Sequence, residues 1–119
     1  MEPEPFRAIQ KRERELIQRL LMPAFPGRDE VSRQLETARA RTFDEDGSFE
    51  FLVEPGTGVD HVKYAVPTEG EYEDPDGVTV HVLLHVVGSA VKEIELYRED
   101  NTRVRTWPNP ETLRVYAPA

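Results

Sequence analysis

The stretch that decides the fold is Val78-Thr79-Val80-His81-Val82-Leu83-Leu84-His85-Val86-Val87. Its even-numbered positions are all aliphatic, whereas its odd-numbered positions mix polar and apolar side chains. Alternation with a period of two and an excess of β-branched residues is typical of a strand with one buried face. We therefore expect residues 78–87 to form the central strand of an antiparallel sheet.

The turns on both sides of this strand predict its partners. Asp74-Pro-Asp-Gly77 has proline at its second position and glycine at its fourth, which suits a tight turn. On the other side, a three-residue loop at Gly88-Ser-Ala90 leads into a strand at 91–98. Both registers keep the aliphatic side chains on one face. They predict these cross-strand pairs: Glu71 with His81, His85 with Glu93, Leu83 with Glu95, and His81 with Tyr97.

Two more strands are expected upstream. A type I turn with Gly47 in the left-handed conformation pairs Phe43 with Phe49, and both rings then share the core face with Phe51. A further strand is expected from about His61 to Glu73. Because proline cannot donate to a ladder, Pro67 makes that strand an edge or breaks it.

The first third of the chain has a helical period. Apolar residues between about 7 and 22 fall on one stripe, and a shorter helix over about 30–38 follows with Asp29 as its N-cap. The sequence therefore predicts a single α+β domain over residues 1–119. Its two N-terminal helices pack on one face of an antiparallel meander sheet of about five strands. That sheet covers about 40–98, and residues 99–119 wrap around the body.

Composition excludes several classes of protein. The 119 residues contain no cysteine, so a disulfide scaffold, thiol catalysis and cysteine-ligated zinc are excluded. The N-terminal residues are acidic and lack the apolar segment of a signal peptide, and no apolar run is long enough to cross a bilayer. We expect a cytoplasmic protein with no bound cofactor.

The charge is distributed unevenly along the chain. The formal net charge is −8, yet residues 1–41 hold nine basic and seven acidic side chains. Between Asp44 and Asp76, eleven acidic side chains stand against a single base, Lys63. A field of this sign repels nucleic acid and anionic membranes and attracts a basic partner. We therefore expect a basic protein as the partner, with neither nucleic acid nor membrane binding.

Two histidines on the central strand suggest a site. His81 and His85 point to the same face, with Glu71 and Glu93 beside them, which is the chemistry of a divalent metal site or a general base. Their roots are about 13 Å apart on a regular strand, which favours a solvated sheet face over shared ligation of one ion. The candidate binding residues are Glu69, Glu71, Glu73, Asp74, His81, His85, Glu93, Glu95 and Tyr97.

Short motifs are spread over nearly the whole chain. They are Phe6-Arg-Ala-Ile9, Leu16-Ile-x-x-Leu-Leu21, Phe25-Pro-Gly-Arg-Asp29, Asp44-x-Asp-Gly-Ser48, His81-Val-Leu-Leu-His-Val86 and Tyr97-Arg-Glu-Asp100. Together they resemble a family of small uncharacterised bacterial proteins. The resemblance implies a small bacterial accessory protein, and it brings no activity and no catalytic residue with it.

Three functions follow as hypotheses. The first is a non-enzymatic interaction module, immunity-like or regulatory, whose acidic residues 44–76 and outer sheet face receive a basic partner such as a toxin domain. The second is a metal-binding protein or hydrolase that uses His81, His85 and Glu93. The third is a homo-oligomeric structural protein that associates through the partly apolar outer face of the sheet.

Overall fold

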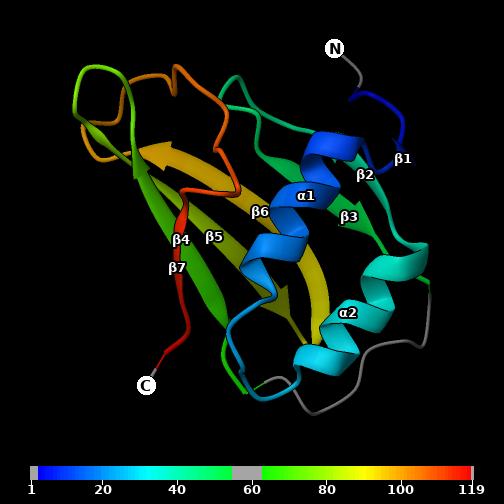
Figure 1. Cartoon of the computed structure of the whole chain (residues 1–119). Coiled ribbons are helices and arrows are strands. Elements are labelled where there is room, and N and C mark those ends of the chain that lie inside the picture. Colours follow the sequence, from blue (N-terminus) through cyan, green and yellow to red (C-terminus); the bar gives the residue numbers. More distant parts are fainter. Residues whose placement is uncertain (1–2, 55–62, 119) are drawn as a thin grey trace.

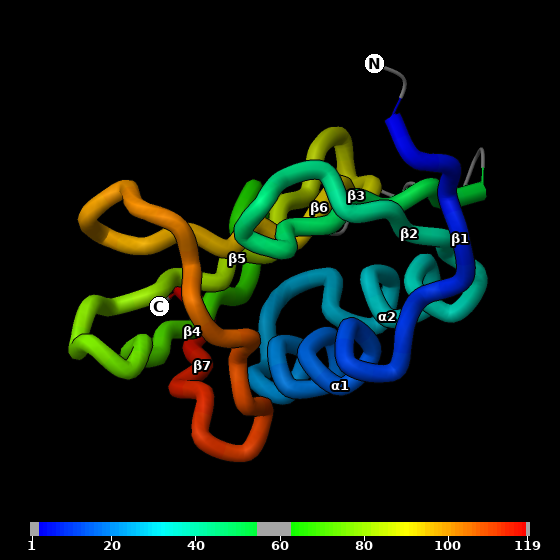
Figure 2. The backbone as a smooth tube through the Cα atoms, turned by 90° about the horizontal axis from the view of Figure 1, so that it is seen from above, coloured from blue at the N-terminus to red at the C-terminus, as the bar shows by residue number. Residues whose placement is uncertain are grey.

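The structure is a computed structural model that describes residues 3–54 and 63–118. In these residues two helices and an antiparallel sheet of seven strands form an α+β fold (Figure 1). Both helices lie on the same side of this sheet (Figure 2). The predicted class and the two-layer arrangement are confirmed.

The elements have the following bounds: β1 (Arg7–Ala8), α1 (Lys11–Leu20), α2 (Arg28–Thr37), β2 (Arg39–Thr42), β3 (Phe49–Leu52), β4 (Thr68–Glu73), β5 (Thr79–Val87), β6 (Ala90–Arg98) and β7 (Arg114–Tyr116). The strand order across the sheet is β1-β2-β3-β6-β5-β4-β7, so the strand predicted over residues 78–87, β5, lies between β6 and β4. The sheet has two more strands than predicted because the chain adds a short strand at each edge, β1 and β7.

The predicted pairing around β5 is confirmed. Glu71 lies opposite His81, His81 also lies opposite Tyr97, and His85 lies opposite Glu93. The turn between β4 and β5 closes as expected, because the Asp74 amide donates to the Val78 carbonyl oxygen at 2.9 Å.

The loop between β5 and β6 differs from the prediction. Val87 pairs with Ala90, so the turn consists of only two residues, Gly88 and Ser89. Both have positive φ angles, 57° and 62°, as a tight hairpin turn requires. A bulge that leaves Lys92 without a partner then restores the predicted register from His85 onward. The side chains predicted to face the core therefore do so, although the predicted three-residue turn is wrong.

The sheet is not the simple meander predicted. β3 pairs with β6, with Phe49 opposite Ile94, and the chain then crosses to β4 on the far side of β5. The β4-β5-β6 meander leaves one edge of β6 free, and the β2-β3 hairpin covers that edge. Exposed edges are unfavourable, which is the physical reason for this pairing.

The hairpin between β2 and β3 is also shifted from the prediction. Thr42 lies opposite Phe49, and the Phe43 amide donates to the Ser48 carbonyl oxygen at 3.0 Å. The Asp44 carboxylate accepts hydrogen bonds from the amides of Asp46 and Ser48, both at 3.0 Å, and this closes a longer loop. Phe43 therefore points away from the core and is 44% exposed, contrary to the prediction.

Both helices begin at residues other than those predicted. Arg7 and Ala8 pair with β2, so α1 begins at Lys11 instead of near residue 7. The Glu13 carboxylate holds this start, because it accepts bonds from the Gln10 amide at 2.9 Å and from both terminal nitrogens of Arg7. α2 begins at Arg28, earlier than predicted, after Gly27 rather than Asp29 at its N-cap.

The predicted strand from His61 begins only at Thr68, directly after Pro67. Residues 61 and 62 lie outside the described part of the chain, as does the loop before them from residue 55. At the other end, residues 99–113 pass along the helix side of the sheet before β7 pairs with β4 (Figure 1). The predicted wrap is present, and it ends in an edge strand.

The core fills the space between the helices and the inner face of the sheet. Its helical members include Leu16, Leu20 and Val31, each no more than 1% exposed. Phe49 lies at its centre, with the Phe51 ring edge-on at 5.5 Å and the Trp107 ring stacked at 6.2 Å. The sheet is therefore buried on one face, and alternation along each strand directs every second side chain to the other face.

Candidate functional site

The face of the sheet opposite the helices is covered by neither of them (Figure 2). We call it the outer face. Its side chains alternate with the buried ones along each strand. They are Arg39, Arg41, Glu50, Leu52, Glu69, Glu71, Glu73, Thr79, His81, Leu83, His85, Val87, Glu93, Glu95, Tyr97, Arg114 and Tyr116.

Eight of the nine candidate residues predicted from sequence lie on the outer face, and Asp74 does not. The Asp74 side chain has no exposed surface and is ion-paired with Arg98. A protein partner therefore cannot reach it, and we remove it from the candidate surface.

Arginines neutralise the margins of the outer face. Arg41 donates from Nε to Glu50 at 2.6 Å on one side. On the other side, the Arg114 guanidinium bonds to Glu73 at 2.8 Å and to Glu71 at 3.4 Å. These contacts lower the pKa of the Glu73 carboxyl, chiefly through the hydrogen bond from Arg114. Three of the acids on this face are thus balanced by arginine.

The middle of the outer face keeps a negative charge. Within residues 3–54 and 63–118, none of four central glutamates forms an ion pair with arginine or lysine, and two have histidine as their partner. These four are Glu69 on β4, Glu93 and Glu95 on β6, and Glu99, which follows β6. We call them the central carboxylates.

The histidines bond to glutamates other than those predicted. His85 Nε2 lies 2.9 Å from Glu95, and His81 Nε2 lies 2.9 Å from Glu99. The contact with Glu95 is diagonal to the cross-strand pair of His85 with Glu93, and the contact with Glu99 is diagonal to the pair of His81 with Tyr97, on the side of His81 away from Glu71. The His81 ring also stacks on Tyr97, with 4.9 Å between centroids. Each histidine is therefore held by its own carboxylate.

The metal hypothesis gains no support from this arrangement. Among the residues that the structure describes, no group of three or more histidine, aspartate or glutamate side chains is placed to hold one metal ion. His81 and His85, with different glutamate partners, form two separate pairs instead of one ligand set.

Two tyrosines border the central carboxylates. Tyr97 is partly buried on β6, and Tyr116 on β7 is 43% exposed. The pKa of Tyr97 is raised, first by burial and then by the charges of Glu95, Glu69 and Glu99. Burial and the charges of Glu69 and Glu71 likewise raise the pKa of Tyr116. Both phenols therefore lie in a negative field and stay protonated at neutral pH.

A second charged cluster, which the sequence reasoning missed, lies at one end of the inner face. Arg98 is 1% exposed, and its guanidinium bonds to three carboxylates. The distances are 2.9 Å to Asp74, 2.8 Å to Asp76 and 2.9 Å to Asp100. The guanidinium lowers the pKa of Asp76 to about 2 and also lowers that of Asp100.

This cluster anchors the segment 99–113. Asp74 accepts bonds from the backbone amides of Arg105 and Thr106 and from the Thr106 hydroxyl at 2.7 Å. The Tyr72 hydroxyl donates to the Thr106 carbonyl oxygen, and burial raises the pKa of that phenol. The cluster is structural, because the pair at its centre, Arg98 and Asp74, is buried and its hydrogen bonds hold the segment 99–113. The available signal was Arg98 itself, since the alternation on β6 places it on the buried face.

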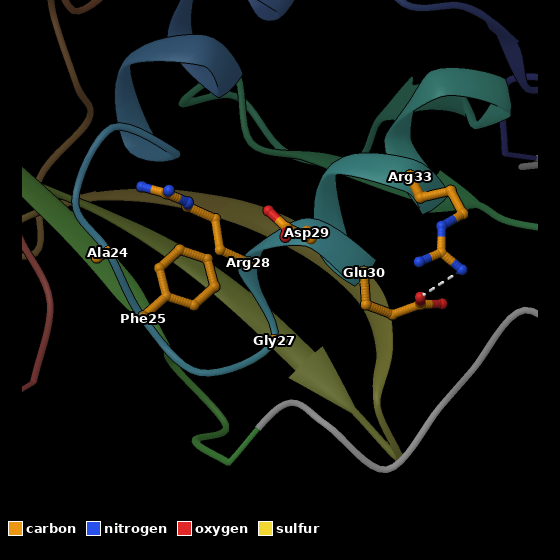
Figure 3. A pocket seen from close by; sticks show the side chains of 7 residues that line it. All are labelled: Ala24, Phe25, Gly27, Arg28, Asp29, Glu30 and Arg33. Carbon is orange, nitrogen blue, oxygen red and sulfur yellow. Dashed lines mark ion pairs between the residues drawn. The ribbon is translucent and has the colours of Figure 1, made fainter.

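A hollow lies beside α2 (Figure 3). Its volume is about 280 Å³, and it lies at the start of the helix. Glu30 forms an ion pair with Arg33 at 2.9 Å, and Asp29 also lines the hollow. Two carboxylates in the first turn oppose binding of an anion at this helix N-terminus. The hollow therefore lacks the chemistry of an anion site.

Comparison with known proteins identifies a family. The family model described as "Domain of unknown function (DUF6984)" matches residues 6–108. The chain belongs to this family. Neither a curated protein nor a solved structure matches the chain. The resemblance noted in the sequence is thus confirmed at the level of the family, and membership assigns no catalytic residue.

None of the helices in the described residues is long and apolar enough to cross a membrane.

Proposed function

We propose that this member of the DUF6984 family is a non-enzymatic interaction module that binds a basic protein on its outer face. The observation that carries the proposal is the set of central carboxylates, which face solvent in the middle of an uncovered sheet. Arginines balance the margins of that face but not its centre. The partner is accordingly expected to present lysine or arginine over a relatively flat surface.

Physical chemistry supports a partner of this kind. Carboxylates on a protein surface attract basic proteins over a distance set by the Debye length. Because the Debye length grows as the salt concentration falls, the attraction raises the association rate at low salt. Affinity needs apolar contact as well, and interfaces are enriched in tyrosine. Leu83, Tyr97 and Tyr116 offer such contact next to the charges.

The cellular setting is part of the same proposal. We place the module in the bacterial cytoplasm, where a protein without cysteine needs no protection from oxidation or reduction. An immunity-like or regulatory role fits a small acidic protein that neutralises a basic partner such as a toxin domain.

The test is capture of the partner from lysate of the native organism at low and at high salt. Three baits are compared: the natural protein, an outer-face variant and a charge-matched control. The outer-face variant carries Glu69→Lys, Glu93→Lys and Glu95→Lys. The control carries Glu15→Lys, Glu36→Lys and Glu111→Lys, all at exposed positions away from the outer face. Both variants change the net charge from −8 to −2, since each substitution adds two positive charges.

The proposal predicts a basic protein that the natural protein and the control retain at low salt. The outer-face variant should lose it, and high salt should release it from all baits. Equal capture by the outer-face variant and the control would show that the outer face is not the binding surface. Capture of no basic protein by any bait would count against the proposal as a whole.

A further inference from the structure

One part of the outer face lies across the four successive strands β6, β5, β4 and β7. One cross-strand row there consists of Glu95, Leu83, Glu69 and Tyr116, taken from β6 to β7. The next row begins with Tyr97, which lies opposite His81. Glu69 thus has an apolar side chain on one side and an aromatic ring on the other.

Two tyrosines lie near Glu69 on the outer face. Tyr116 lies directly opposite it on the neighbouring strand. Tyr97 is one row away, and stacking on His81 at 4.9 Å fixes the plane of its ring. The electrostatics agree with this placement, because the Glu69 charge raises the pKa of both phenols.

Glu69 is the member of this group with a free carboxylate. It has no ion pair with any residue in 3–54 or 63–118, whereas His85 holds Glu95 and Arg114 holds Glu71 and Glu73. The side chain is only half-buried, so it can be reached from solvent. A free carboxylate opposite a leucine and a tyrosine, with a second tyrosine one row away, has the chemistry of a cation seat.

We propose that Glu69, Tyr97, Tyr116 and Leu83 form a seat for one arginine side chain of the partner. This inference rests on the proposed function and names the contact that gives it specificity. The Glu69 carboxylate accepts two parallel N–H bonds from the guanidinium, the tyrosine rings stack against its plane, and Leu83 contacts its methylene groups.

Arginine suits the seat better than lysine. A guanidinium is planar and weakly hydrated, so it can stack on an aromatic ring and donate in its own plane at the same time. An ammonium is a compact, strongly hydrated charge that gains little from the two rings. Glu93, which is also unpaired in residues 3–54 and 63–118, lies opposite Glu50 and His85, so it lacks the tyrosine neighbours that favour arginine over lysine.

The experiment compares blocked tri-arginine and tri-lysine peptides as probes. Each is titrated into the ¹⁵N-labelled full chain at low salt, and amide shifts give the dissociation constants. The variants are Glu69→Gln and Tyr116→Leu, with Glu93→Gln as the matched control, because Glu93 lies on the same face outside the seat. Their amide spectra without peptide show whether each variant is folded.

The natural protein should bind the arginine peptide about fivefold more tightly than the lysine peptide. Glu69→Gln and Tyr116→Leu should reduce this ratio to below about twofold, whereas Glu93→Gln should weaken both peptides and keep the ratio. Equal affinities for the two peptides, or equal effects of Glu69→Gln and Glu93→Gln, would overturn the seat and leave the acidic surface standing. Absence of shifts on the outer face with either peptide would instead contradict the proposed function.

Discussion

The buried Asp74 carboxylate accepts four hydrogen bonds, and we predict that Asp74→Asn destabilises the protein strongly. Its Oδ2 accepts from Arg98 at 2.9 Å and from the Arg105 amide at 3.0 Å. Its Oδ1 accepts from the Thr106 amide at 3.1 Å and from the Thr106 hydroxyl at 2.7 Å. All of these groups are donors, so both oxygens are needed.

The magnitude follows from the donors that lose an acceptor. An asparagine amide has one oxygen and one nitrogen, and the nitrogen only donates. With the nitrogen at the Oδ2 position, the Arg98 guanidinium and the Arg105 amide both face a donor; at the Oδ1 position the Thr106 hydroxyl can rotate and accept, so only the Thr106 amide does. An unsatisfied buried donor costs about 1–3 kcal/mol, and a neutral acceptor opposite Arg98 costs about 1 kcal/mol more, so the expected loss is about 2–4 kcal/mol. This is a large part of the stability of a typical domain, about 5–15 kcal/mol.

Urea unfolding of the natural protein, Asp74→Asn and Asp76→Asn measures the effect. Asp76 is the control, because its side chain is 28% exposed and water can replace part of its bonding. We expect the larger loss for Asp74→Asn, an unchanged m-value, and faster hydrogen exchange at the amides of Arg105 and Thr106. A loss below about 1 kcal/mol would refute the claim that this carboxylate anchors residues 99–113.

Two further predictions concern the loss of stability at low pH and the close packing around Gly70. The Arg98 guanidinium holds the pKa of Asp76 at about 2, below its ordinary 3.8, and also lowers the pKa of Asp100. These two carboxylates therefore stabilise the folded protein fully above about pH 4, and this stabilisation is lost as the pH falls through their folded pKa values. The urea midpoint should therefore drop between about pH 4 and pH 2, and a flat midpoint there contradicts the role of the cluster. Gly70→Ala would bring a Cβ within 3.0 Å of the Arg114 carbonyl oxygen and 3.1 Å of Leu113, which should cost about 1–3 kcal/mol and speed hydrogen exchange in β7. Unchanged stability and exchange would show that β7 tolerates the displacement.

The register around β5 could be predicted because two local signals agree. The period of two defines which side chains face the core, and the turn residues at Asp74–Gly77 limit how the strands align. A slip by one residue would have moved Leu84 and Val82 out of the core. This agreement also explains why eight candidate residues were placed on one face before the structure was known.

Other features depended on contacts that local patterns do not encode. The turn is one residue shorter than predicted, and the bulge at Lys92 adds one unpaired residue to β6, so the register from His85 onward is unchanged. The alternation of apolar and polar residues therefore cannot reveal either feature. The pairing of β3 with β6 joins strands separated by some forty residues, and its choice depends on which edge is left free.

The candidate site was predicted only in part. Register places Glu93 beside His85, but the hydrogen bond goes to Glu95, because rotamers decide between a direct and a diagonal neighbour. Tyr116 was missed because β7 is too short to show a period. Asp74 was assigned to the surface as a turn residue, and its burial by Arg98 depends on the position of residues 99–113.

The association rate of the captured basic partner, measured over a series of salt concentrations, tests the central claim most directly. The natural protein and the control with Glu15→Lys, Glu36→Lys and Glu111→Lys should associate rapidly at low salt and slow by about tenfold or more as salt rises. The variant with Glu69→Lys, Glu93→Lys and Glu95→Lys should associate slowly at every salt concentration. If this variant and the control instead follow the same curve, net charge alone accounts for the attraction, and the outer face is not the binding surface.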